Sequence, residues 1–210
     1  MQEDDEGGGE GLALGRTLAL SDGIFAIAMT LLAFQIQPPD LHGSEIHHLA
    51  SVLGALGNRY FVYVLSFAVI GTLWLAHHRI FRNVRRADEA LMSLNVLFLM
   101  AVAALPFPSA VMGLYGSQRT AVVLYASSMA VAGSLLGALL LVARRRRLLT
   151  PEATQEGIVA SLWNSAATVV VFTLSIPVAL VAPTVAPYTW LVVIPLRLVR
   201  GKVSRRAVRT

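Results

Sequence analysis

Polar side chains that can bind or transfer a proton lie inside stretches of sequence that are otherwise apolar. They are Ser21, Asp22, Trp74, His77, His78 and Asn95. An ionisable residue inside such a stretch is costly, so it indicates either a function or a dedicated partner. Asp22 and His77 have the chemistry of a proton relay or an ion-binding pair, because an imidazole changes its charge near neutral pH.

The same residues also have a structural interpretation. Trp74 precedes His77 and His78 by three and four residues, so a helix places these side chains on one face. Buried polar groups are tolerated when they satisfy one another. Because Asp22 is the one carboxylate within the apolar stretches, we favour a polar clamp between helices over a relay. Arg16 lies close enough to Asp22 in sequence to help neutralise it.

The surrounding composition is that of an integral membrane protein. Of the 210 residues, 56% are hydrophobic and 14% are charged, where a soluble domain carries about 25% charged residues. Stretches long enough to cross about 30 Å of hydrocarbon recur at 17–37, 59–78, 90–113, 120–143, 158–182 and 185–199, of which the last is short. These stretches predict an all-α integral membrane fold with six transmembrane helices.

The six spans define the expected domain organisation. A transmembrane domain at 16–199 lies between an acidic tail at 1–15 and a basic tail at 200–210. The segment from Ala182 to Pro187 carries two prolines and predicts a tight hairpin between the fifth and sixth spans.

Basic residues predict the orientation of these spans. All of the 17 Lys and Arg residues except Arg59 and Arg119 flank the spans on one side. Because cytoplasmic loops carry the excess of basic residues, we expect both termini in the cytoplasm. The run Arg144, Arg145, Arg146 and Arg147 follows an apolar span, and we expect it to contact anionic lipid headgroups rather than nucleic acid.

The first outer loop contains His42, His47 and His48 beside Asp40 and Glu45. Histidine and carboxylate side chains together can bind a metal or respond to pH. Their spacing fits no strong metal motif, however, so we interpret them as a solvated loop that leads into a short interfacial helix. The chain contains no cysteine, which excludes disulfides and thiolate metal sites. No metal or cofactor is expected.

The first span carries two stripes of different size. Gly23, Ala26 and Thr30 are small and permit close helix approach. Ile27, Leu31 and Phe34 form an apolar stripe at helical spacing. Such a stripe faces lipid or another helix more often than it lines a pore, so periodicity alone leaves its environment open.

Four segments in chain order resemble the transmembrane-protein-175 (TMEM175) potassium channel family. They are Arg16–Asp22 and 25–32 in the first span, 74–81 in the second span and 105–109 late in the third. The Phe of the family signature is Leu20 here, which removes an aromatic side chain but leaves Ser21 and Asp22 in place.

This resemblance implies a homotetramer in which the first helices of four chains line a central pore. It implies a hydrophobic gate at Ile27, a constriction continued by Leu31 and Phe34, and a selectivity position at Thr30. It also implies an inter-helix polar network that consists of Arg16, Ser21, Asp22, Trp74, His77 and Asn95. The implied function is a leak-type potassium-permeable channel of a bacterial plasma membrane, with weak to moderate preference for K⁺ over Na⁺.

Other function classes remain as alternatives. A proton-coupled secondary transporter would use Asp22 and His77, and a membrane scaffold would conduct nothing. An enzyme is not expected, because no span contains a nucleophile–base pair or a two-carboxylate metal site.

Overall fold

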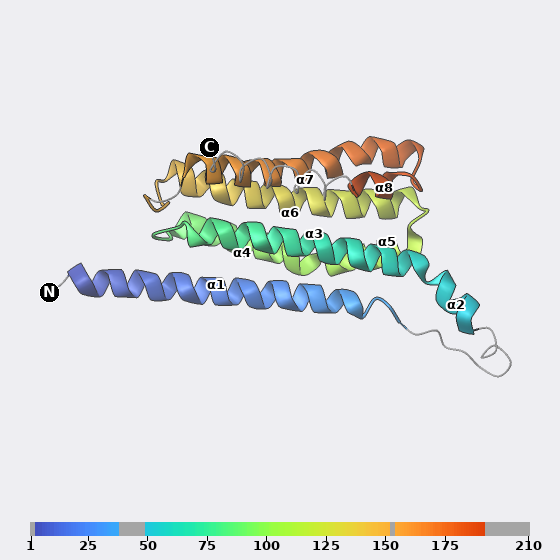
Figure 1. The fold of residues 1–210 in the computed structure, drawn as a ribbon, viewed down its shortest axis with the longest axis horizontal. Helices are drawn as coiled ribbons and strands as arrows, with labels where there is room; N and C mark the ends of the chain where they lie inside the picture. Colours follow the sequence, from blue (N-terminus) through green and yellow to red (C-terminus); the bar gives the residue numbers. More distant parts are fainter. Residues whose placement is uncertain (1–2, 38–48, 152–153, 192–210) are drawn as a thin grey trace, which may run out of the picture.

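The computed structural model describes residues 3–37, 49–151 and 154–191. These residues form an all-helical bundle whose long helices run nearly parallel to one another (Figure 1). The first helix lies along one edge, and the last two lie along the opposite edge. The all-α class predicted from the sequence is therefore confirmed.

Eight helices are present in the described part of the chain. They are α1 (Glu3–Ala33), α2 (Leu49–Ala55), α3 (Gly57–Arg82), α4 (Glu89–Ala104), α5 (Pro106–Tyr115), α6 (Arg119–Arg145), α7 (Gln155–Val181) and α8 (Ala186–Trp190). α1 packs on α3, α4 and α5, whereas α6 packs mainly on α7.

Five segments among the described residues are long and apolar enough to cross a membrane. They are Leu14–Ala33, Gly57–Arg82, Glu89–Tyr115, Arg119–Arg145 and Gly157–Val181. Each of them corresponds to one of the first five predicted spans.

The two ends of the chain can be compared with the predicted sixth span and the predicted acidic tail. The predicted sixth span at 185–199 begins with α8, and its part beyond residue 191 lies outside the described residues. At the other end, α1 begins at Glu3, so most of the predicted acidic tail is helical and continuous with the first span.

The third predicted span is divided at a proline. α4 ends at Ala104 and α5 begins at Pro106, with Leu105 between them. Proline has no backbone N–H and its ring crowds the preceding turn, so the helical hydrogen-bond ladder cannot continue through it. The amide of Leu105 bonds instead to the carbonyl of Val102, three residues earlier. Beside the break, the Pro106 carbonyl accepts a hydrogen bond from the side chain of Gln35, just after α1.

The α6–α7 pair packs closely because a glycine allows it. A β-carbon at Gly133 would lie 3.1 Å from Val169 Cγ2 and 3.4 Å from Thr168 Cγ2. Beside this contact, Tyr125 of α6 stacks on Trp190 of α8 with ring centroids 4.8 Å apart. α6, α7 and α8 therefore form one tightly packed side of the bundle.

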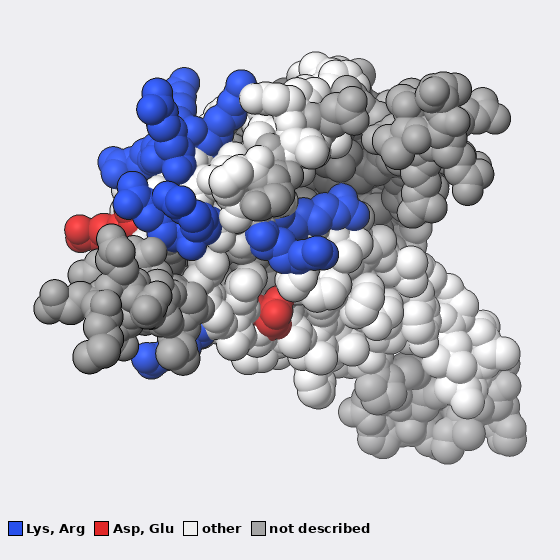
Figure 2. All heavy atoms as spheres, turned by 60° about the vertical axis from the view of Figure 1, so that its left-hand side comes forward, with Lys and Arg blue, Asp and Glu red and all other residues white. Residues whose placement is uncertain are grey.

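Two loops at one end of the bundle are joined by backbone hydrogen bonds. Val84, between α3 and α4, pairs with Leu149, between α6 and α7, as an isolated antiparallel bridge. Arginines of these two loops and of the helix ends beside them gather at this end of the molecule (Figure 2). They are Arg82, Arg85, Arg86, Arg144, Arg145, Arg146 and Arg147.

The first outer loop is described only in part. The short helix expected from Ser44 to Leu56 is present as α2 from Leu49 onwards. His42, His47 and His48 lie outside the described residues.

Candidate functional site

α1 has one face that packs into the bundle. The buried residues on this face recur three or four positions apart, as they must on a helix that contacts its neighbours along one side. They are Thr17, Ser21, Phe25, Ala28 and Leu32. The helix is therefore fixed in rotation relative to α3, α4 and α5.

The opposite face of α1 is exposed in the single chain and is strongly apolar. Ile27 is 60% exposed, Leu31 44% and Phe34 75%. Leu20 is 57% exposed and Thr30 is also exposed. Leu20, Ile27 and Phe34 are seven residues apart, which is the repeat of helices that pack on one another. The residues predicted to line a pore thus lie on the face that turns away from the rest of the chain.

Small residues accompany this exposed stripe. Gly15, Ala19, Gly23, Ala26 and Thr30 are all exposed and follow one another at steps of three or four. A β-carbon added at Gly23 would meet nothing within 4 Å. Because small residues let the backbones of membrane helices approach closely, this face is suited to packing against further helices.

Asp22 is held by a tryptophan from the neighbouring helix. Trp74 of α3 donates its indole N–H to Asp22 Oδ1 over 2.7 Å. A hydrogen bond to a charged acceptor is about twice as strong as one between neutral groups. This bond ties α1 to α3.

A second set of bonds joins α1, α4 and α3. His77 Nε2 lies 2.8 Å from Asn95 Oδ1, and Asn95 Nδ2 donates to Ser21 Oγ over 3.4 Å. Ser21 in turn donates to the Thr17 carbonyl over 2.8 Å. Ser21, His77 and Asn95 are all buried, so each bond satisfies a group that water does not reach.

Aromatic rings enclose His77. Its ring stacks on Phe81 at 4.4 Å and on Phe98 at 5.4 Å, and Phe25 of α1 lies 5.8 Å away. Three helices therefore contribute to a cage around one imidazole. Sequence reasoning missed this cage, although aromatic residues one turn from His77 and from Asn95 were a signal for it.

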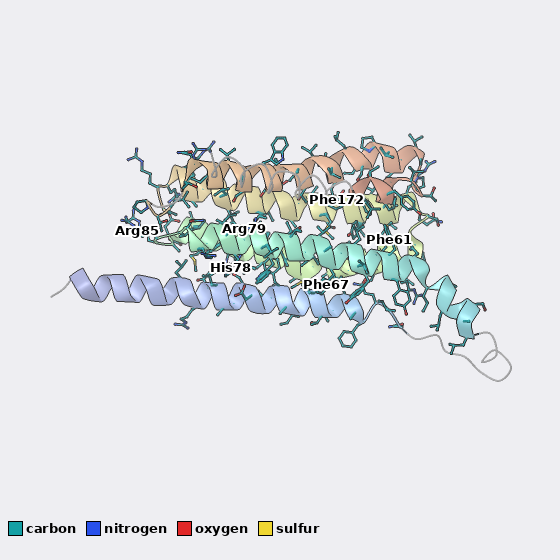
Figure 3. The ribbon with its side chains drawn as sticks, in the orientation of Figure 1. Phe61, Phe67, His78, Arg79, Arg85 and Phe172 are labelled. Carbon is teal, nitrogen blue, oxygen red and sulfur yellow. The ribbon has the colours of Figure 1, made fainter. Side chains whose placement is uncertain are left out.

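Two further polar residues near these contacts are His78, which lies outside the expected network, and Arg16, which belongs to it. The His78 ring packs beside Trp74 with centroids 5.9 Å apart, on the side of α3 that faces α1 (Figure 3). Its Nδ1 is buried and has no hydrogen-bond partner among the described residues. Arg16 is exposed, and within the described part of the chain no ion pair to Asp22 is present.

The two polar sets are adjacent but separate. Among the described residues, Asp22 and His77 do not hydrogen-bond to each other; each has its own partner in Trp74 or Asn95. No group of three or more metal-ligating side chains forms in this part of the chain either. The arrangement is suited to fixing helix positions, while the apolar exposed face of α1 is left for other contacts.

The chain is similar in sequence to proteins of a known family. Residues 16–106 match the family described as endosomal/lysosomal potassium channel TMEM175. A potassium channel of Streptomyces collinus is 50% identical over 101 residues, which are 48% of this chain and 48% of that channel. The human endosomal/lysosomal proton channel TMEM175 is 41% identical over 103 residues, which are 46% of this chain and 20% of that protein.

Similarity of fold extends further along the chain than similarity of sequence. The matched stretch spans about half the length of the Streptomyces collinus relative. By contrast, the crystal structure of a lysosomal potassium-selective channel TMEM175 homologue from Chamaesiphon minutus matches with a TM-score of 0.78. It is 29% identical and covers 90% of this chain and 97% of that chain.

Proposed function

We propose that this chain, whose residues 16–106 match the TMEM175 family and whose fold matches that of a TMEM175 homologue, forms a potassium-permeable cation channel whose pore is lined by α1. The family and the structural neighbours are ion channels rather than enzymes. The proposal includes a homotetramer, because a helix at the edge of one chain encloses a pore only when several copies meet.

The observation that carries this proposal is the exposure of one face of α1. α1 lies along the edge of the bundle, and its exposed face combines large apolar residues with small ones. A helix that only faced lipid would not need the small residues, whereas helices that pack around an axis do. The relatives named as potassium channels match this chain in the stretch that includes α1.

The proposed gate is a ring of Ile27 side chains, one from each subunit. An apolar constriction blocks ions by excluding the water that accompanies them. Leu31 and Phe34, further along the same face, extend the narrow part outward. Because K⁺ releases water more readily than Na⁺, such a constriction favours K⁺ weakly to moderately.

Thr30 is the proposed selectivity position. Its hydroxyl donates to the Ile27 carbonyl over 2.9 Å. This bond uses the proton and leaves the oxygen available as an acceptor. On the exposed face next to Ile27, that oxygen would replace part of the hydration shell of a passing cation.

The polar contacts of Asp22, Trp74, Ser21, Asn95 and His77 have a supporting role in this proposal. They hold α1 against α3 and α4 and thereby keep Ile27 directed toward the axis. Arg16 completes the proposed network near the membrane surface. A proton-coupled transporter would instead require proton transfer between Asp22 and His77, which have separate partners.

The proposed location is a bacterial plasma membrane with both chain ends in the cytoplasm. The α3–α4 loop with Arg85 and the end of α6 with Arg144 lie at one end of the bundle, while Arg59 and Arg119 lie in the first turns of α3 and α6 at the other. An excess of arginine at one end indicates the cytoplasmic side. The run from Arg144 to Arg147 would contact anionic headgroups there.

The experiment uses the absence of cysteine from the chain. Ile27→Cys places a thiol on the proposed pore face, and Phe25→Cys places one on the buried face as the matched control. A positively charged, membrane-impermeant thiosulfonate reagent should block potassium flux through Ile27→Cys in liposomes and leave Phe25→Cys unaffected. A pore lined by α1 would be contradicted if the reagent modified the thiols of Ile27→Cys and Phe25→Cys to the same extent and left the flux through Ile27→Cys unaltered.

A further inference from the structure

The end of the bundle opposite the arginine-rich loops contains a cavity of about 380 Å³. It lies between the end of α1, the start of α3 and all of α5. Its apolar wall on α5 includes Phe107, Ala110 and Leu114. Phe107 is 68% exposed and Leu114 54% exposed, so the cavity opens at the side of the bundle as well as at its end.

Two side chains hold the walls of this cavity in place through three hydrogen bonds. Gln35, just after α1, donates to the Pro106 carbonyl over 2.7 Å. Asn58, at the start of α3, donates to the carbonyls of Gly113 over 2.9 Å and Met112 over 3.2 Å. The Pro106 carbonyl lies in the first turn of α5, next to the break between α4 and α5. The cavity is therefore preformed in the single chain.

Arg59 gives the cavity a positive charge. Its stem lies over Gly113, where an added β-carbon would be 3.6 Å from Arg59 Cγ. It is the third residue of α3, at the level where a spanning helix meets the headgroups, and its guanidinium can extend to the surface while the stem stays on apolar atoms. Among the described residues, no carboxylate lines the cavity.

We propose that this cavity binds an anionic phospholipid, with the phosphate on Arg59 and one acyl chain along the apolar walls. A guanidinium binds phosphate through two parallel hydrogen bonds. A small free anion would use Arg59 alone and gain nothing from Phe107 or Leu114. The proposal requires this end of the bundle to lie at a membrane surface, and it does not require the chain to conduct ions.

The test is native mass spectrometry of the full chain in detergent with phosphatidylglycerol or with phosphatidylcholine of the same acyl chains. The wild-type protein should retain phosphatidylglycerol preferentially, and inorganic phosphate should not displace it. Arg59→Gln should weaken this binding about fivefold, which corresponds to about 1 kcal/mol for one arginine near an anionic lipid. Arg119→Gln is the matched control, because Arg119 begins α6 at the same end but does not line the cavity.

A second variant tests the apolar walls with the charge left in place. Ala110→Trp fills the cavity and should reduce phosphatidylglycerol binding while Arg59 remains. Equal losses in Arg59→Gln and Arg119→Gln would overturn the proposal, as would displacement of the lipid by phosphate or normal binding by Ala110→Trp. The same spectra report the oligomeric state, so a variant that fails to assemble is recognised directly.

Discussion

At the residue scale, the position of α1 depends on a few polar atoms in an apolar setting. Asp22 accepts from Trp74, and Asn95 lies between Ser21 and His77. In such surroundings the loss of one partner leaves the other without water to replace it, which costs more than the bond itself contributed. These few contacts therefore have a large effect on the placement of α1.

Substitution of Asp22 separates a clamp from a proton relay. Asp22→Ala removes the acceptor of Trp74 and should destabilise the protein by about 1.5–3 kcal/mol, the usual range for a hydrogen bond to a charged group. Asp22→Asn keeps an acceptor oxygen and should retain most of the stability and the flux. Thermal unfolding in detergent and potassium flux in liposomes measure the two effects. Loss of flux in a stably folded Asp22→Asn protein would favour the relay.

Substitution of Ile27 tests the hydrophobic gate. Ile27→Asn should wet the constriction, raise the conductance and reduce the preference for K⁺ over Na⁺. If the barrier falls by about 1 kcal/mol, the current rises roughly fivefold. Met100→Asn is the matched control, because Met100 on α4 is 62% exposed and Ile27 is 60% exposed. Similar conductance in Ile27→Asn and Met100→Asn would show that Ile27 is not at the gate.

At the element scale, helix ends and close helix contacts hold the bundle together. Asp88 begins α4 by accepting from the Leu91 amide over 2.9 Å, and its other oxygen binds Arg146 Nη1 over 2.8 Å. One carboxylate thus caps a helix and joins the α3–α4 loop to the end of α6. The backbone bridge between Val84 and Leu149 connects the same two loops.

The cap at Asp88 predicts a dependence of stability on pH. The Leu91 amide, followed by Arg146, holds the pKa of Asp88 below its ordinary value. A lowered pKa in the folded state means that the contribution is complete above the unfolded pKa and is lost as pH falls through the folded one. Melting temperature should therefore fall in acid more steeply for the wild type than for Asp88→Ala.

At neutral pH, Asp88→Asn should have a melting temperature between those of the wild type and Asp88→Ala, because Asn still caps the helix. Parallel acid profiles of wild type and Asp88→Ala would contradict this role.

Close packing of α6 on α7 predicts a difference between two glycines. Gly133→Val should destabilise the protein by about 1–3 kcal/mol, since extra atoms in a packed contact force the helices apart. Gly71→Val is the control, because a β-carbon at Gly71 meets nothing within 4 Å. Chemical unfolding of both variants measures the difference in stability. Equal stability of Gly133→Val and Gly71→Val would contradict the close packing of α6 on α7.

The elements that could be predicted from the sequence are those with a strong one-dimensional signal. The first five spans follow from long apolar stretches, and the closeness of Asp22, Trp74, His77 and Asn95 follows from their positions along adjacent antiparallel spans. The choice between His77 and His78 depends on the rotation of α3, which no local pattern in that helix determines. The break at Leu105 was present in the sequence as Pro106, but a proline does not always interrupt a helix.

Contacts between distant loops left no signal in the sequence. The bridge between Val84 and Leu149 joins two backbones, and backbone pairing depends little on side-chain identity. The binding of Arg146 rather than its neighbours to Asp88 depends on how α6 ends. Such contacts depend on how the helices pack, so the sequence alone does not predict them.

At the scale of the whole molecule, the single chain leaves α1 half covered. One face packs on α3, α4 and α5, while Ile27, Leu31 and Phe34 on the other remain exposed. An assembly of four chains around α1 would cover the small residues of this face and enclose the large ones. Native mass spectrometry should then give a complex of four times 22.6 kDa. A monomer that conducts ions would contradict this assembly.

The most direct test of the central claim is planar-bilayer recording of the purified protein with potassium chloride on one side and sodium chloride on the other. A pore lined by the apolar face of α1 predicts discrete cation currents whose reversal potential shows that K⁺ is more permeant than Na⁺. Absence of current, together with saturable potassium uptake that requires a proton gradient in liposomes, would contradict the channel and favour the transporter that uses Asp22 and His77.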